Sequence, residues 1–233
     1  MIQLLRKRLV GHRYKAGIFL LLSLASAICL ILVLARIRYS LSYDYLGLIW
    51  NLFLAWIPFL SAFVVYILAL RRVAMYVAIP AFALLWLIFF PNAPYILTDF
   101  QHLSRGSSPV PLWYDVILLV WFSWTGMLLG IVSLALMQEI IKREFNRAIG
   151  WIFVFGVAAL SSAGVYVGRF IRLNSWDIFQ NPTKAAVNLW DWLSEPTLRS
   201  FGFIGLYTVF FVFVYLTIYA IGHLLQEQPY KSK

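Results

Sequence analysis

The sequence FFPNAPYILTDFQHL, residues 89–103, ends an apolar run that would otherwise form an ordinary membrane-spanning helix. Pro91 and Pro94 lie three residues apart. Each proline lacks a backbone N–H and disfavours helical geometry in the residue before it, so the pair predicts a break in the helix. Asn92 stands between the two prolines, where its side chain can hydrogen-bond the freed backbone.

Polar side chains follow this break at helical spacing. A short helix that restarts after Pro94 would bring Tyr95, Asp99 and His102 within about 60° of one another around the helix axis. Asp99 and His102 are therefore candidate catalytic residues, as an acid–base pair. The alternative is a purely structural contact between Asp99 and His102 at a helix end.

The composition excludes a soluble globular domain and a disordered chain. The 233 residues are 63% hydrophobic and 12% charged, and the apolar residues occur in long runs, which is typical of membrane spans. We expect one integral membrane domain over residues 1–233, an all-α bundle of about six transmembrane helices. The net charge of +10 is assigned to topology signals beside the spans, and we expect the bilayer and not nucleic acid as the partner.

The expected spans lie near residues 16–35, 46–70, 73–90, 113–137, 149–167 and 203–222. The third span ends at the proline break. The last loop is the longest, and residues 184–193 after Thr183 place Val187, Trp190 and Leu193 near one face, which predicts a short interfacial helix. A cleaved signal peptide is the alternative for the first span; we favour an uncleaved span because the apolar run continues past the small residues of the potential cleavage site.

Small residues recur at four-residue steps in the fourth and fifth spans. Gly126 and Gly130 form one step, and Gly156, Gly164 and Gly168 form a ridge. Such surfaces let another helix approach closely. We therefore expect these faces to pack against a helix, which could belong to a membrane-protein partner or to a second copy of the chain.

Most of the 19 Lys and Arg residues lie on the side of the two termini, so the positive-inside rule predicts cytoplasmic termini. This places the proline motif on the outer face together with Asp115 and with residues 168–177, GRFIRLNSWD. The candidate substrate-binding residues at this face are Asn92, Tyr95, Asp115, Arg169, Arg172, Asn174 and Asp177.

The two outer motifs carry opposite charges, and both interrupt or end spans, so their polar backbone needs partners other than lipid. We hypothesise that they converge into one site. Arg169 and Arg172, one helical turn apart, could clamp a phosphate or a carboxylate. They could instead extend to the lipid headgroups, or pair with Asp99, Asp115 or Asp177. Asp99 and His102 alone are too few ligands for a metal, so we predict neither a metal nor a cofactor; no nucleotide-binding glycine motif is present.

Residues 90–99, His102, Leu103 and residues 168–177 resemble the bacterial integral-membrane family called domain of unknown function 1361. The resemblance covers the chain from the second span to the sixth. It implies a multi-span protein of a bacterial cytoplasmic (inner) membrane and brings no activity, cofactor or catalytic residue with it. The family's pattern has an aromatic residue after the second arginine, where this chain has Leu173.

Three classes of function remain open. The first is an enzyme or binding protein for an anionic or lipid-linked substrate at the outer face, and the sequence leaves open whether a reaction occurs. The second is a transporter or permease component, with the broken third span in its path. The third is a non-catalytic accessory subunit that docks a partner through its glycine faces.

Overall fold

The computed structural model describes residues 2–71, 77–104, 109–173, 175, 177–194 and 197–227, and these residues are helical almost throughout. In chain order the elements are α1 (Ile2–Ser40), α2 (Leu46–Arg71), α3 (Ala78–Phe89), α4 (Asn92–Tyr95), the 3-10 helix η1 (Ile96–Ser104), α5 (Leu112–Glu144), α6 (Arg147–Tyr166), the π-helical turn η2 (Val167–Ile171), α7 (Asp177–Gln180), α8 (Pro182–Ser194) and α9 (Leu198–Glu227).

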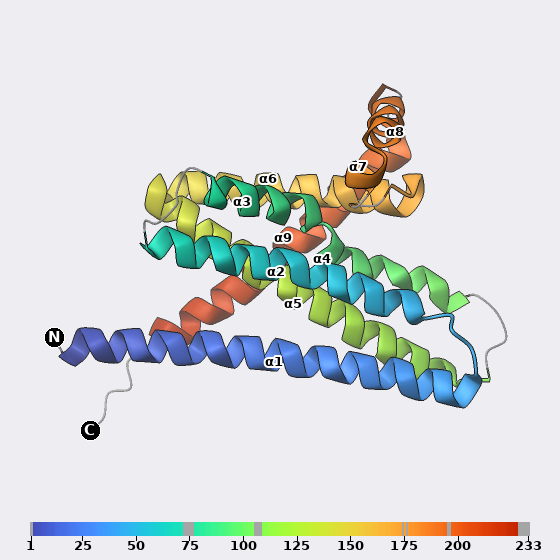
Figure 1. Cartoon of the computed structure of the whole chain (residues 1–233), viewed down its shortest axis with the longest axis horizontal. Coiled ribbons are helices and arrows are strands. Elements are labelled where there is room, and N and C mark those ends of the chain that lie inside the picture. The colour runs from blue at the N-terminus through green and yellow to red at the C-terminus, as the bar shows by residue number, and fades with distance from the viewer. Residues whose placement is uncertain are drawn as a thin grey trace.

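Six helical segments of the described chain are long and apolar enough to cross a membrane, which confirms the expected helical bundle of membrane spans. They start near Ala16, Leu46, Ala78, Leu112, Arg147 and Leu198. Figure 1 shows them running between two ends of the bundle. We call these ends the termini end, where α1 begins and α9 finishes, and the α8 end, where α7 and α8 lie; α4 lies near the middle of the bundle, and η1 runs from it toward the α8 end.

Helix α5 lies at the centre and is the span most buried by its neighbours. One side of it carries Leu118 and Phe122 into a core shared with α1 and α2. Its other side carries Met127 and Leu134 into a second core shared with α3, α6 and α9. Because lipid is as apolar as these side chains, close fit between helices rather than exclusion from water holds such spans together.

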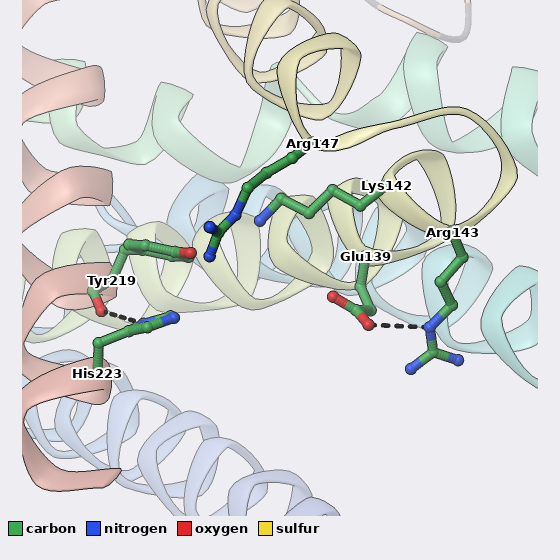
Figure 2. Close-up of a pocket in the computed structure, with 6 residues that line it drawn as sticks. All are labelled: Glu139, Lys142, Arg143, Arg147, Tyr219 and His223. Carbon is green, nitrogen blue, oxygen red and sulfur yellow. Dashed lines mark hydrogen bonds and ion pairs between the residues drawn. The ribbon is translucent and has the colours of Figure 1, made fainter. Parts of the chain in front are cut away.

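The end of α5 differs from expectation. The charged residues after Met137 were expected in a loop, but the helix continues to Glu144, so Phe145 and Asn146 alone separate it from α6. Glu139 and Arg143 lie one turn apart on this extension and form an exposed ion pair (Figure 2). Favourable (i, i+4) pairs of this kind support helix at the end of a span.

The proline break occurs where the sequence predicts it. Helix α3 ends at Phe89, and the chain turns through Pro91 into α4. The new helix starts at Asn92, before rather than after Pro94, and continues as the 3-10 helix η1. In a 3-10 helix residues three apart lie directly above one another, so Asp99 and His102 share one side of η1.

Side chains from α4, α5, α9 and the segment after η2 satisfy the carbonyl groups around the break. In addition to its bond to a carbonyl group of the break, Asn92 donates to Ser175 Oγ at 2.9 Å. This bond connects the α4 turn to the segment after η2. A polar group unpaired in hydrocarbon costs several kcal/mol, so these bonds allow the break to exist at membrane depth. The donor–acceptor pairs are Ser175 Oγ to Ile88 O at 3.2 Å, Asn92 Nδ2 to Phe89 O at 3.0 Å, Tyr207 Oη to Pro94 O at 2.6 Å, and Ser123 Oγ to Ile96 O at 3.3 Å.

The α4 turn packs against the glycine steps of α5 and of α6–η2. A Cβ atom at Gly126 would lie 2.7 Å from the Ala93 carbonyl oxygen, and one at Gly130 would lie 3.2 Å from Ala93 Cβ. On the other side, a Cβ at Gly164 would lie 2.9 Å from Pro91 Cβ. The chain's own α4 turn thus covers Gly126, Gly130 and Gly164, whereas a Cβ at Gly156 would meet no atom within 4 Å and that part of the ridge is left open. Docking of a partner on these faces stays a prediction.

Helix α8 stands crosswise to the spans and projects beyond α6 (Figure 1), and it begins at Pro182, before the expected Thr183 cap. Its apolar residues Val187, Trp190 and Leu193 are exposed, as an amphipathic helix lying in a membrane interface requires.

We predict that Gly164→Leu destabilises the folded protein, because the added side chain would collide with the Pro91 ring. The matched control is Gly156→Leu on the same helix, where an added Cβ meets no atom within 4 Å. Thermal unfolding of the purified protein in detergent should show a fall of several degrees for Gly164→Leu and little change for Gly156→Leu. Equal effects of the two changes would show that the α4 turn does not press on α6.

Candidate functional site

A buried ion pair joins the two outer motifs. The Arg169 guanidinium, from η2, donates from Nη2 to Asp99 Oδ1 of η1 at 2.5 Å and from Nε to Thr98 Oγ1 at 2.8 Å. Its face lies 4.3 Å from the centre of the Tyr95 ring. The side chains of Arg169 and Asp99 are only 7% and 4% exposed. The two motifs therefore lie against each other, and the structure realises the pairing alternative for Arg169; that they form one functional site stays a prediction.

Two further side chains reach the same carboxylate. Asn51 of α2 donates from Nδ2 to Asp99 Oδ2 at 2.9 Å. His102 Nε2 lies 3.6 Å from Asp99 Oδ1, and about a third of the His102 side chain is exposed. Asn51 is not among the residues predicted from the sequence, although an amide inside an apolar span is a signal, because it needs a partner in the bundle. Asp99 is thus held from η1, η2 and α2.

A small cavity of about 50 Å³ lies between α2, the α4 turn and η2. Asn51, Asn92, Tyr95 and Ser175 contribute to its lining. This volume has room for a few water molecules, and the amide and hydroxyl groups offer them hydrogen bonds. Two of the predicted substrate-binding residues, Asn92 and Tyr95, therefore border an enclosed polar space beside the ion pair.

A larger pocket of about 320 Å³ lies at the α8 end. Arg172 enters it from the end of η2, where its φ of 60° places it in the left-handed region and ends the helix. Leu173 lines this outer pocket and the small cavity alike. The lining residues are Ile171, Arg172, Leu173, Asp177, Asn181, Lys184, Ala185 and Asn188. Arg172 and Asp177 are thus brought together, while the predicted Asn174 lies outside the described residues.

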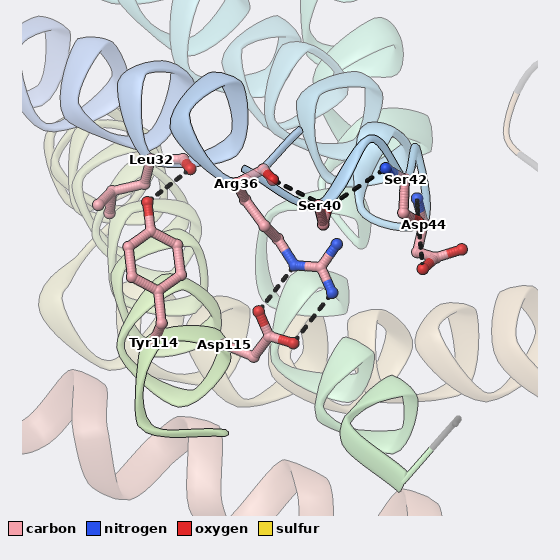
Figure 3. A network of polar contacts seen from close by, with 7 residues as sticks. All are labelled: Leu32, Arg36, Ser40, Ser42, Asp44, Tyr114 and Asp115. Carbon is pink, nitrogen blue, oxygen red and sulfur yellow. Dashed lines mark hydrogen bonds and ion pairs between the residues drawn. The ribbon is translucent and has the colours of Figure 1, made fainter. Parts of the chain in front are cut away.

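Asp115 lies apart from both pockets. Its carboxylate accepts from Arg36 Nε at 2.7 Å and from Arg36 Nη2 at 3.1 Å (Figure 3). The Arg36 guanidinium lies 4.2 Å from the Tyr45 ring, and burial together with the nearby Asp115 charge raises the pKa of the Tyr45 phenol. Tyr114 adds a bond from its hydroxyl to the Leu32 carbonyl at 2.8 Å. This cluster fastens α1 to α5.

No group of three or more His, Cys, Asp or Glu residues that could hold a metal ion occurs among the described residues. The groups that the site offers are a carboxylate fixed by Arg169 and Asn51, a neighbouring imidazole, and cations at the pocket beyond.

We predict strong energetic coupling between Asp99 and Arg169. Removing one charge leaves the other buried and unpaired, which costs about 3–5 kcal/mol, whereas removing both costs much less than the sum. Asp99→Asn, Arg169→Gln and the double variant, compared by thermal unfolding in detergent, should show that the second change partly rescues the first.

The exposed pair Glu139–Arg143 is the matched control, because its side chains are 45% and 48% exposed. The same cycle of Gln substitutions there should give coupling of at most about 1 kcal/mol. If the effects at Asp99 and Arg169 simply add, the two residues do not act as a pair.

Comparisons with known proteins agree with the sequence motifs. The family described as "Protein of unknown function (DUF1361)" matches residues 50–216 of the chain. The match runs from α2 into α9 and includes both outer motifs, the cavity and the outer pocket. No curated protein and no solved structure matches the chain. Since the matched residues make up well over half of the sequence, this multi-span membrane protein belongs to the DUF1361 family.

Proposed function

We propose that the protein binds an anionic molecule, free or linked to a lipid, in the outer pocket at the α8 end. The observation that carries this proposal is that two cationic side chains, Arg172 and Lys184, and two amides, Asn181 and Asn188, line one space of about 320 Å³ that has a single carboxylate, Asp177, in its lining. Guanidinium, ammonium and amide N–H groups are all donors to phosphate or carboxylate oxygens.

Arg172 is a better ligand-binding group than Arg169. Arg169 already gives hydrogen bonds to Asp99 and Thr98 and is buried. Arg172 is exposed, lines the pocket and makes no ion pair with another described residue, so a ligand can reach it from outside. In this proposal Asp99 and Arg169 hold η1 and η2 together and thereby fix the backbone that presents Arg172.

The position of the pocket favours a ligand with a lipid tail. Helix α8 contributes Lys184 and Asn188 to the lining, and it exposes Val187 and Trp190. Apolar side chains of this kind suit the boundary between headgroups and acyl chains. An anionic headgroup could then occupy the pocket while its chain stays in the bilayer.

If the protein is an enzyme, His102 and Asp99 supply the acid–base chemistry. Asp99 is committed to Arg169 and Asn51, so its part would be to orient the imidazole. His102 is partly exposed and is the group that could pass a proton to a substrate.

We further propose a bacterial inner membrane as the location, with the termini end in the cytoplasm. The excess of Lys and Arg at that end supports this orientation.

We predict that Arg172→Gln and Lys184→Gln each weaken binding of farnesyl phosphate to the protein in neutral-lipid nanodiscs by about tenfold, since each removes a charge-assisted hydrogen bond of about 1.5–3 kcal/mol. Isothermal titration calorimetry measures the affinity. Arg38→Gln, an exposed arginine in the last turn of α1, is the control and should leave it unchanged. Unchanged affinity in the Arg172→Gln/Lys184→Gln variant would refute the proposal. Inorganic phosphate, tested in parallel, distinguishes a free anion from a lipid-linked one.

Reporter fusions test the orientation. An alkaline phosphatase fusion inserted at Thr183 should be active, because this enzyme folds only outside the cytoplasm, and a fusion at the C-terminus should be inactive. The reverse result would place the outer pocket in the cytoplasm.

A further inference from the structure

A second pocket, of about 540 Å³, lies at the opposite, termini end of the bundle. It is formed where the last turns of α5, the first turn of α6 and the last turns of α9 meet (Figure 2). Its lining consists of Glu139, Lys142, Arg143, Arg147, Tyr219 and His223. None of these residues belongs to the two outer motifs.

The cations of this pocket outnumber its carboxylates. Glu139 is engaged by Arg143, whose Nε lies 2.8 Å from Oε1. Lys142 and Arg147 remain, and within the described chain neither makes an ion pair with a carboxylate. Figure 2 shows the Arg147 guanidinium and the Lys142 ammonium pointing toward the same space beside the Tyr219 hydroxyl. Two like charges that face one space repel each other unless an anion lies between them.

The Lys142 side chain is held in place from two directions. Its stem lies flat on Gly150 of α6, where an added Cβ would come within 2.5 Å of Lys142 Cγ. Its ammonium lies 5.2 Å from the centre of the Trp151 ring and 5.0 Å from that of Tyr219. Contacts of a cation with two aromatic faces fix its position. A lysine that served only as a topology signal would extend toward the headgroups and would not need contacts with two aromatic rings.

The α9 side of the pocket is also ordered. His223 Nδ1 lies 3.0 Å from the Tyr219 carbonyl oxygen. Because a carbonyl can only accept, Nδ1 carries the proton and Nε2 is the nitrogen left for other partners. The two rings lie 4.1 Å apart, so Tyr219 and His223 form one packed wall opposite Lys142 and Arg147.

We propose that this basic pocket is a binding site for a phosphate group, with Lys142 and Arg147 as its principal ligands. Lys142, Arg143 and Arg147 against Glu139 leave a surplus of two positive charges, which suits an anion that carries more than one negative charge or several acceptor oxygens. Arg147 can give two parallel hydrogen bonds, and Lys142 adds a point charge. The phosphate could belong to a lipid headgroup of the facing leaflet or to a soluble compound.

The test uses the full-length chain carrying Arg172→Gln and Lys184→Gln, so that binding at the outer pocket does not contribute. Two probes separate the sources of phosphate. Inorganic pyrophosphate binding is measured by isothermal titration calorimetry in neutral-lipid nanodiscs. Retention of phosphatidylglycerol over phosphatidylcholine is measured by native mass spectrometry.

Adding Lys142→Gln and Arg147→Gln should lower the affinity for pyrophosphate, or the retention of phosphatidylglycerol, at least tenfold. Loss for phosphatidylglycerol alone identifies a lipid headgroup, and loss for pyrophosphate alone identifies a soluble ligand. Arg38→Gln, which removes one exposed positive charge and so matches Arg147→Gln alone, is the control and should change neither. If the double change disturbs folding, Arg147→Gln alone replaces it, because Arg147 is exposed. This single change should cause a smaller loss of binding. Undiminished binding of both probes, or binding of neither before the change, overturns the inference and leaves the outer pocket untouched.

Discussion

A backbone broken inside a membrane must find its hydrogen-bond partners within the protein, because lipid offers none. This requirement governs the third span, where Pro91 and Pro94 remove donors and turn the chain. Ser175, Tyr207 and Ser123 come from three other parts of the chain to bond the carbonyl groups around the turn. The break therefore organises the part of the bundle between α4 and the α8 end, since these segments must approach the turn to bond its carbonyl groups.

Close approach requires small residues, and the glycines of α5 and α6 supply them on opposite sides of the turn. With the turn in place, η1 carries Asp99 against Arg169 of η2. The buried pair is costly to separate and so keeps the two motifs in register. Arg172 follows one turn later with a left-handed backbone and reaches the outer pocket. Packing at the glycines and the ion pair of Asp99 and Arg169 thus connect the proline break to the proposed anion site.

Local chemistry explains what could be predicted from the sequence. Long apolar runs give the six spans, two prolines give the break, and the bond from Asn92 to Phe89 follows from the position of Asn92. Partners between helices were harder to predict, because sequence does not fix the distance between spans. Asp115 was grouped with the outer motifs as a substrate-binding residue, but in the structure it pairs with Arg36 of α1, apart from both pockets. The contact of Asn51 with Asp99 and the packing of the α4 turn on the glycines could not be predicted for the same reason.

The central claim is that the α4 turn and the segment after η2 lie against each other in the membrane. Cross-linking of Asn92→Cys with Ser175→Cys tests it directly, because these side chains are 2.9 Å apart in the structure. The background carries Cys29→Ser, which removes the chain's one native cysteine. Copper phenanthroline or a short bis-thiosulfonate, applied to membranes, should join the pair within one chain, whereas Asn92→Cys with Tyr39→Cys should not react. If positions 92 and 175 fail to cross-link in a protein that still folds, the two motifs do not meet and the account is wrong.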